Sequence, residues 1–375
     1  MIESIRICNF KSLRDVTVQL SPVTVLIGRS GTGKTNFVQA IRFLRDYLQK
    51  HEGAVNEMGG WERVLCATRS PASALLFDVT FRVPRIDRGF RYMLSLQTRE
   101  KGAGAHFSSE SLMLDGQPLF AQGAGQWSRP PDLVDAPQPN QPVLGLLYGI
   151  PDARLAYVIL TRGVGCYDFP GDVLCGGRQG ADAGLLDQGS NYLAALDAIN
   201  TNLAELGREL EMRAALQRLN RSITSVDLSA DRNDVRVGHK VADAKVLSFA
   251  LAQESEGFRR FLAHLIALYQ QPPKQVLVFE EPEKGIYPGA LSVLAEYFQA
   301  VAASGRSQVI LTTHSPQLLK HFAADQIRAV TMDGYDTAIG PIAPEQRESL
   351  EQQLMTADEL LTVDEARIAS ATPNA

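Results

Sequence analysis

The residues from Gly28 to Thr35 combine glycines, a lysine and a threonine in a spacing that suits phosphate binding. They read Gly-Arg-Ser-Gly-Thr-Gly-Lys-Thr and fit the pattern GxxxxGK[ST]. Glycines let backbone N–H groups curl around phosphate oxygens, Lys34 adds a positive charge, and the Thr35 hydroxyl can coordinate Mg²⁺. An apolar run at 23–27 precedes the loop and a helical pattern at 36–49 follows it, so the helix points its positive end at the anion. This arrangement predicts binding and hydrolysis of ATP.

The predicted nucleotide contacts extend from the loop into the first residue of the helix. The set is Gly28, Ser30, Gly31, Thr32, Gly33, Lys34, Thr35 and Asn36. The alternative is a glycine-rich turn without a ligand. The strand before the loop and the helix after it favour the phosphate site, because chance matches to the pattern lack that context.

Two adjacent carboxylates, Glu280 and Glu281, follow the apolar run 276–279. Paired carboxylates at the end of a buried strand are costly unless a cation or a substrate uses them. A parallel sheet holds its ligands at the carboxyl ends of its strands, so these acids can reach the phosphate loop. We therefore expect Glu280 to join the Mg²⁺ shell through water and Glu281 to polarise the attacking water. The alternative is an exposed strand end with solvated charges.

Two other segments carry groups that can meet a phosphate. His314 follows the strand-like run 308–312 and could touch a γ-phosphate, although an isolated histidine is normally a core or surface residue. Ser255 and Gly257 stand before a predicted helix, and a hydroxyl with a glycine at a helix N-terminus can make an anion site. Taken alone, Ser255 is equally typical of an ordinary helix N-cap.

Composition places the chain among globular proteins. It has 375 residues, enough for two lobes, with 45% hydrophobic and 21% charged residues. No apolar run approaches the roughly 20 residues that cross a bilayer, and the first residues lack the layout of a signal peptide, so we expect a cytoplasmic protein without membrane contact. Four scattered cysteines without CxxC spacing argue against a zinc site.

The net charge of −5 does not indicate a nucleic-acid binder, so any DNA contact must come from a local patch. The alternative for each candidate patch is a solvated face of a sheet or helix. The first candidate is Arg82, Arg85, Arg88, Arg91, Arg99 and Lys101. The second is Arg208, Arg213, Arg218 and Arg221.

Apolar periodicity predicts the elements that position these motifs. The predicted strands are 2–8, 15–20, 23–27, 74–83, 90–98, 276–279 and 308–312. The predicted helices are 36–49, 191–220, 258–269 and 289–303. The first two strands form a hairpin around a turn at residues 9–12, and the stretch 121–142 predicts a long loop. Buried strands alternate with helices in the last third, which predicts a parallel sheet core.

The order of these motifs resembles the ABC-type ATPase heads of SMC proteins, the RecF recombination protein and the OLD-family ATPases. The matching stretches are Ile7-Cys8-Asn9-Phe10-Lys11-Ser12-Leu13 with the phosphate loop, the signature motif Ser255-Glu256-Gly257, the Walker B and D-loop at 279–288, and the switch histidine in Thr313-His314-Ser315-Pro316. The Walker B form, together with the stretches 188–193 and 357–361, is similar to compact bacterial defence-associated members. Two departures are Glu254, where leucine usually leads the signature, and Tyr287-Pro288 in place of His-Pro.

The resemblance implies an α/β P-loop NTPase fold with a mixed sheet core, an antiparallel β subdomain and a helical lobe. The implied lobes are 1–120 with Walker A and the antiparallel β subdomain, 121–240 with an insertion and the helical lobe, and 241–375 with the signature, Walker B, D-loop and switch histidine. In this family the signature of one head caps the ATP of another, so the resemblance implies an ATP-gated homodimer. Ser255 and Gly257 would act in trans, while the catalytic residues Lys34, Glu281 and His314 would act in cis with Mg²⁺ on Thr35 and Glu280.

Segments that larger relatives carry are missing from the sequence. The span between Thr35 and Ser255 shows no heptad pattern for an SMC coiled coil, and the residues after His314 show no acidic cluster typical of an OLD nuclease. We therefore expect the chain to act on DNA directly or on a separate effector, a nuclease or a toxin. One hypothesis is a nucleic-acid-sensing ATPase of bacterial antiphage defence, and the alternative is a RecF-like repair or recombination clamp. A transporter ATPase subunit is disfavoured because its signature normally reads LSGGQ.

Overall fold

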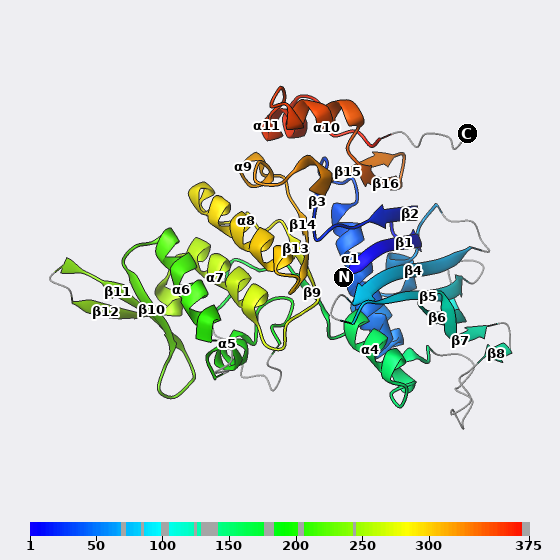
Figure 1. Cartoon of the computed structure of the whole chain (residues 1–375), viewed down its shortest axis with the longest axis horizontal. Helices are drawn as coiled ribbons and strands as arrows, with labels where there is room; N and C mark the ends of the chain where they lie inside the picture. Colours follow the sequence, from blue (N-terminus) through cyan, green and yellow to red (C-terminus); the bar gives the residue numbers. More distant parts are fainter. Residues whose placement is uncertain are drawn as a thin grey trace. The chain divides into compact units, whose positions relative to one another are not determined.

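Two compact units make up the chain, and the first contains both ends of the sequence (Figure 1). Unit 1 comprises residues 1–164 and 323–375, and unit 2 comprises residues 165–322. The computed structural model describes residues 1–68, 73–83, 86–98, 105–123, 126–128, 142–175, 184–201, 206–242 and 245–369.

Unit 1 contains a seven-stranded antiparallel sheet in the order β2-β1-β4-β5-β6-β7-β8. Its strands are β1 (Ile2–Phe10), β2 (Leu13–Gln19), β4 (Ala74–Val83), β5 (Arg88–Thr98), β6 (Ala105–Leu114), β7 (Gln117–Gly123) and β8 (Gln126–Ser128). Apolar side chains alternate along β4, and Leu75, Phe77 and Val79 on one of its faces are fully buried. The predicted hairpin and the strands at 74–83 and 90–98 are confirmed.

Two details of this sheet differ from the sequence-based expectations. The hairpin turn is only Lys11 and Ser12, because Asn9 and Phe10 still belong to β1. The stretch 121–142 is not wholly a loop, since β7 ends at Gly123 and β8 pairs with it. Residues 124–125 and 129–141 of that stretch lie outside the described ranges.

Unit 1 also contains strands in the order β16-β15-β3. The phosphate loop follows β3. Strand β3 (Val23–Ile27) pairs in parallel with β15 (Ile327–Asp333), and β15 pairs antiparallel with β16 (Asp336–Pro341). Helix α1 (Lys34–Lys50) follows the loop and buries the predicted apolar stripe of Phe37, Ala40, Ile41, Leu44 and Leu48. The N- and C-terminal segments share one unit because β15 completes its backbone hydrogen bonds with β3.

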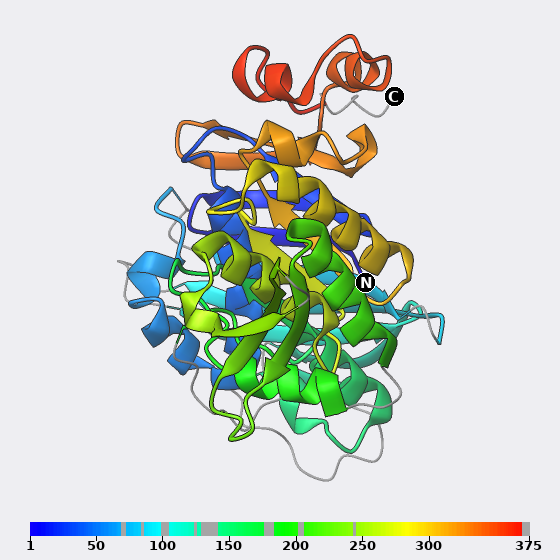
Figure 2. The ribbon, with the colours of Figure 1, turned by 90° about the vertical axis from the view of Figure 1, so that its left-hand side faces the viewer.

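Short helices complete unit 1. They are α2 (Glu52–Glu57), α3 (Trp61–Val64), η2 (Leu144–Leu146), α4 (Pro151–Leu160), η6 (Ala324–Gln326), α10 (Pro344–Glu351) and α11 (Ala357–Thr362). Both views show the red helices α10 and α11 beside the orange C-terminal strands β15 and β16 (Figure 1, Figure 2). None of the helices in the described ranges is long and apolar enough to span a bilayer.

Unit 2 is built on strands in the order β14-β13-β9. Strand β13 (Val276–Glu280) pairs in parallel with β14 (Gln308–Thr312), and β9 spans Val164–Tyr167. Helices α7 (Glu256–Tyr269), α8 (Pro288–Ala303) and α9 (Pro316–Leu319) belong to the same unit. The rings of Phe279 and Phe298 lie 4.9 Å apart in its core. The predicted alternation of buried parallel strands with helices is confirmed here.

The rest of unit 2 differs from the expected single helix at 191–220. The structure has two helices there, α5 (Tyr192–Thr201) and α6 (Leu206–Leu219), and residues 202–205 lie outside the described ranges. The Thr201 hydroxyl donates to the Asp197 carbonyl at 2.7 Å, a contact that weakens a helix end. Three antiparallel strands that the sequence analysis missed follow, with η5 (Leu251–Gln253) after them. They are β10 (Ile223–Leu228), β11 (Val235–Lys240) and β12 (Val246–Ala250).

The unit boundaries, after residues 164 and 322, do not coincide with the expected lobe boundaries at 120 and 240. The last predicted lobe, 241–375, contributes to both units, because β15 and β16 join β3 whereas β13 and β14 belong to unit 2. The three lobes stay a prediction about functional organisation.

Candidate functional site

The phosphate loop depends on glycines that allow close backbone approach. A Cβ atom at Gly28 would lie 2.2 Å from the Val330 carbonyl oxygen, and one at Gly33 would lie 2.1 Å from Thr337 Oγ1. Gly31 and Gly33 have φ angles of 84° and 105°, which other residues adopt only with strain. The outer face of the loop is therefore packed closely against β15 and β16.

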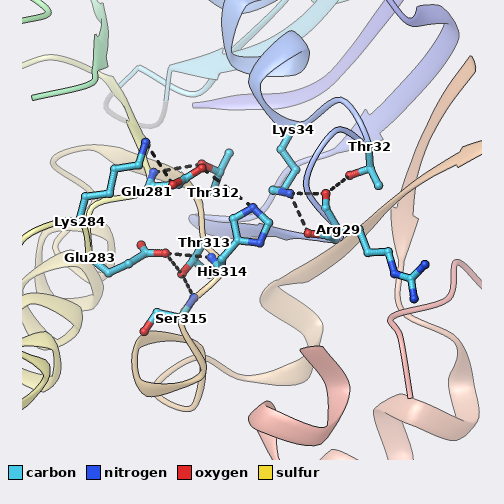
Figure 3. Close-up of polar contacts among 11 residues, drawn as sticks. Arg29, Thr32, Lys34, Glu281, Glu283, Lys284, Thr312, Thr313, His314 and Ser315 are labelled. Atoms are coloured by element: carbon cyan, nitrogen blue, oxygen red, sulfur yellow. Dashed lines mark hydrogen bonds and ion pairs between the residues drawn. The ribbon is translucent and has the colours of Figure 1, made fainter. Parts of the chain in front are cut away.

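The Lys34 ammonium is buried within this loop. Its side chain is only 5% exposed, and Nζ donates to the carbonyls of Gly28 at 2.7 Å and Arg29 at 2.8 Å (Figure 3). The Thr32 hydroxyl donates to the same Arg29 carbonyl at 2.9 Å. The Lys34 ammonium is therefore buried and accepted by two backbone carbonyls at the beginning of the loop.

The beginning of α1 is tied to the β1–β2 turn. Asn36 Nδ2 donates to Ser12 Oγ at 2.7 Å, and Ser12 Oγ lies 2.7 Å from Thr337 Oγ1. Thr337 in turn donates to the Thr32 carbonyl at 2.8 Å. All the predicted phosphate-loop residues thus lie in one continuous segment of unit 1, but the support from Thr337 was missed by the sequence analysis.

In unit 2, Glu281 and His314 lie close together. Strand β13 ends at Glu280, and Glu281 turns sharply with a φ of 45°, while its N–H contacts the carbonyl and hydroxyl of Thr312 at 3.1 Å each. His314 Nε2 lies 4.0 Å from Glu281 Oε1 (Figure 3). The backbone of this turn therefore directs the Glu281 carboxylate toward His314.

Lys284 is a neighbour of this pair that the sequence analysis did not assign. Its Nζ lies 3.1 Å from Glu281 Oε2. Burial alone would lower the pKa of Lys284, but the hydrogen bond to Glu281 and nearby carboxylates raise it above its ordinary value. Lys284 is thus positively charged and forms an ion pair with one carboxylate oxygen of Glu281.

Glu283 holds the backbone at Thr313 and His314 in place. Its Oε1 accepts hydrogen bonds of 2.8 Å from the Thr313 hydroxyl and from the His314 N–H. Burial raises the pKa of Glu283 above its ordinary value, although these donors oppose the shift. This carboxyl therefore positions the switch segment.

The signature segment begins α7. Ser255 Oγ accepts from the Phe258 N–H at 3.2 Å, so this residue is an N-cap, the ordinary role that the sequence analysis left open. Gly257 packs against the D-loop so closely that a Cβ atom there would lie 2.7 Å from the Gly285 carbonyl oxygen. Glu254, the departure from leucine, pairs with His239 of β11 at 2.9 Å. The signature is therefore held by the D-loop and by the three-stranded sheet.

The donor types fit a magnesium nucleotide. Mg²⁺ prefers oxygen ligands and keeps several waters, and Thr35 and Glu280 offer a hydroxyl and a carboxylate. Thr35 belongs to unit 1 and Glu280 to unit 2. Among the described residues there is no cluster of three or more histidine, cysteine, aspartate or glutamate side chains that could hold a metal by itself.

The basic candidates from the sequence analysis are largely neutralised. Arg82 pairs with Glu3 and Asp87, and other described members pair likewise. These pairs are Arg88 with Asp115, Arg91 with Asp78, and Arg218 with Glu296. Arg85, Arg99 and Lys101 lie outside the described residues, as does the Arg208 side chain. Ion pairing on a solvated face therefore accounts for these four paired arginines better than a free patch does.

Comparison with known proteins places the chain among ATPases. Residues 1–81 match the family described as "AAA ATPase domain", and residues 167–320 match "AAA domain, putative AbiEii toxin, Type IV TA system". An SMC head bound to the C-winged helix domain of ScpA is similar over 92% of this chain and 99% of its own, with a TM-score of 0.62 and 15% identity. The chain is an ATPase with the fold of an ABC/SMC-like head.

Two further SMC heads have the same fold. The head from Thermotoga maritima is 13% identical over 91% of this ATPase and 98% of its own chain, with a TM-score of 0.52. The Pyrococcus furiosus head, with an extended coiled coil and bound to the C-terminal domain of ScpA, is 12% identical over 94% and 99%, with a TM-score of 0.54. No curated protein matches this ATPase significantly. The predicted α/β fold, with its mixed sheet and antiparallel β subdomain, and the predicted ATPase activity are confirmed.

Proposed function

We propose that this ATPase acts as an ATP-gated homodimer in which each signature segment completes the nucleotide site of the other copy. The chain carries one phosphate loop and one signature segment, so two copies are needed to form a pair of complete sites. The observation that carries the proposal is the packing of Gly257 on the Gly285 carbonyl, which fixes the N-terminus of α7 against the D-loop. A rigid helix N-terminus with Ser255 and Gly257 is suited to meet the γ-phosphate of a partner's ATP.

In the proposed site, the residues of one copy divide the work of hydrolysis. Backbone N–H groups of the loop from Gly28 to Asn36 bind the phosphates, and Lys34 neutralises their charge. Glu281 polarises the attacking water, and His314 contacts the γ-phosphate. Thr35 and, through water, Glu280 would hold Mg²⁺, which would supply positive charge to the phosphates when bound. Loss of the γ-phosphate removes the link between the two copies and opens the dimer.

We propose further that the dimer controls a separate effector, a nuclease or a toxin, in bacterial antiphage defence, with nucleic acid as the trigger and the cytoplasm as its location. Two observations support this role. The match over 167–320 is to a family whose description names a toxin and a toxin–antitoxin system, and SMC heads with this fold bind another protein, ScpA. The alternative is a RecF-like clamp on DNA, which rests on the same fold and the same motifs.

The dimer is tested with Glu281→Gln, which keeps the shape of the side chain but removes the charge that polarises water. We expect this variant to accumulate a dimer on size exclusion with ATP and to remain a monomer with ADP. Glu348→Gln, on the exposed face of α10, is the matched control and should behave as wild type. If Glu281→Gln stays monomeric with ATP, the gated dimer is wrong.

The biological role is tested with the same trapped variant. Glu281→Gln with ATP should retain a nuclease or toxin partner in a pull-down. Lys34→Ala, which removes the positive charge that binds the ATP phosphates, should not. Binding of DNA without any protein partner would favour the repair clamp. Failure to bind DNA or a partner in the presence of ATP would contradict both roles.

A further inference from the structure

A small cavity separates the phosphate loop from the C-terminal segment of unit 1. It has a volume of about 200 Å³. Gly28, Arg29 and Thr32 line one side, and residues of α11 and of the segment after it line the other, including Leu360 and Glu365. This segment, residues 363–369, is called the strap below. The proposed hydrolysis uses the backbone of the loop but neither the Arg29 side chain nor the strap.

An ion pair bridges the cavity. The Arg29 guanidinium pairs with the Glu365 carboxylate, and the two side chains are 73% and 45% exposed. Figure 3 shows the Arg29 side chain extending away from the Lys34 ammonium, although the Arg29 carbonyl accepts from that ammonium. An exposed ion pair of this kind is weak, so a more highly charged anion can replace the Glu365 carboxylate as the partner of Arg29.

Hydrogen bonds hold the backbone of the strap in place. Glu365 therefore stays near the phosphate loop even when its carboxylate is not paired with Arg29. Gln346, which is 1% exposed, donates to the carbonyls of Asp364 at 3.0 Å and Glu365 at 2.9 Å. Its Oε1 accepts from the Arg367 N–H at 2.8 Å. Leu360 of α11 is fully buried beside the strap. The fixed backbone therefore keeps the Glu365 carboxylate beside the phosphate loop.

We propose that Arg29 supplies a second positive charge to the terminal phosphate of ATP, and that Glu365 competes with that phosphate for Arg29. Arg29 stands one residue after the start of the loop, and its guanidinium can form two parallel hydrogen bonds to a phosphate or a carboxylate. The strap therefore lowers the affinity for ATP in the resting protein, and anything that moves the strap raises it. This inference rests on the proposed binding of ATP at the phosphate loop.

The test measures the dissociation constants of ATP and ADP for the full chain by calorimetry. Glu365→Gln should lower the dissociation constant of ATP roughly two- to fivefold and leave that of ADP nearly unchanged. The reason is that Arg29, once released from Glu365, can bind the third phosphate, which ADP lacks. Asp364→Asn, the neighbouring exposed carboxylate that pairs with Arg367, is the matched control and should leave both constants unchanged. The effect of Glu365→Gln should shrink as salt is raised.

The double variant separates competition for Arg29 from a general effect of charge. Arg29→Gln should weaken ATP, and Arg29→Gln combined with Glu365→Gln should bind ATP as weakly as Arg29→Gln alone. If Glu365→Gln still tightens ATP without Arg29, or if Asp364→Asn has the same effect, the proposal is overturned. If the wild type binds ATP and Glu365→Gln leaves its affinity unchanged, Arg29 and Glu365 have no such role. If the wild type binds no ATP, the proposed nucleotide site is itself wrong, and this inference falls with it.

Discussion

The hydroxyl of Thr337 donates a hydrogen bond of 2.8 Å to the carbonyl of Thr32, inside the phosphate loop. Thr337 belongs to β16, is 4% exposed, and also lies 2.7 Å from Ser12 Oγ. One hydroxyl thus ties the loop to the β1–β2 turn and to β16. The shape of the loop is thus supported by contacts with the turn and with β16.

Thr337→Val should loosen the phosphate loop while keeping the volume of the side chain. The Thr32 carbonyl loses its donor, so we expect the free energy of unfolding to fall by about 1–2 kcal/mol and ATP binding to weaken severalfold. Thermal unfolding and nucleotide titration measure the two effects. Thr17→Val, on an exposed position of β2, is the matched control. Unchanged affinity for ATP in Thr337→Val would show that the loop holds its shape without this bond.

Local patterns account for what the sequence predicted well. The loop at 28–35 and the buried strands at 276–279 and 308–312 are each encoded by adjacent residues, and the structure places those strands within one residue of expectation. Glu281 and His314 also come together, because both follow neighbouring parallel strands. Motifs of this kind carry their geometry with them, whatever the rest of the chain does.

Long-range partners account for what the sequence did not predict. Thr337 and Gln346 look like ordinary surface residues in the sequence, and only the pairing of β15 with β3 brings their segment to the loop. The short strands β10, β11 and β12 follow no clean alternation, since β12 is exposed along nearly its whole length. Burial patterns predict an element only where one of its faces is buried.

Lys284→Met should raise the basal rate of ATP hydrolysis. The ammonium lies 3.1 Å from Glu281 Oε2 and competes with water for that oxygen. We expect kcat to rise about two- to fivefold with an unchanged KM, because an ion pair this exposed is worth less than about 1 kcal/mol. Lys320→Met, an exposed lysine of the same unit, is the control for loss of charge. A fall in kcat would instead make Lys284 a residue that positions Glu281.

Glu110 should make the stability of unit 1 depend on pH. Burial raises its pKa to about 7, although Tyr92 and the N–H groups of Val143 and Leu144 donate to it and oppose the shift. Below its ordinary pKa of 4.5 the carboxyl is neutral in both the folded and the unfolded chain. Between 4.5 and 7 only the unfolded chain ionises, so the folded state loses stability as pH rises, by about 3 kcal/mol in total.

Glu110→Gln removes this ionisation. Its free energy of unfolding, measured by urea titration at a series of pH values, should lack the decline that the wild type shows from pH 4.5 to 7. Glu62→Gln, on the exposed side of α3, is the control and should keep the wild-type slope. An equal slope in Glu110→Gln and wild type would show that other groups set the pH dependence.

Gly257→Ala should separate the signature from the D-loop. The added Cβ would lie 2.7 Å from the Gly285 carbonyl oxygen, a backbone atom that cannot move without shifting the D-loop. We expect the free energy of unfolding to fall by about 1–3 kcal/mol, and the ATP-dependent dimer of the Glu281→Gln background to be lost. Gly207→Ala, in α6, meets nothing within 4 Å and should leave the dimer intact. The prediction is wrong if Gly257→Ala keeps the wild-type free energy of unfolding and still forms the ATP-dependent dimer. The proposed trans site would then not depend on the contact between Gly257 and the D-loop.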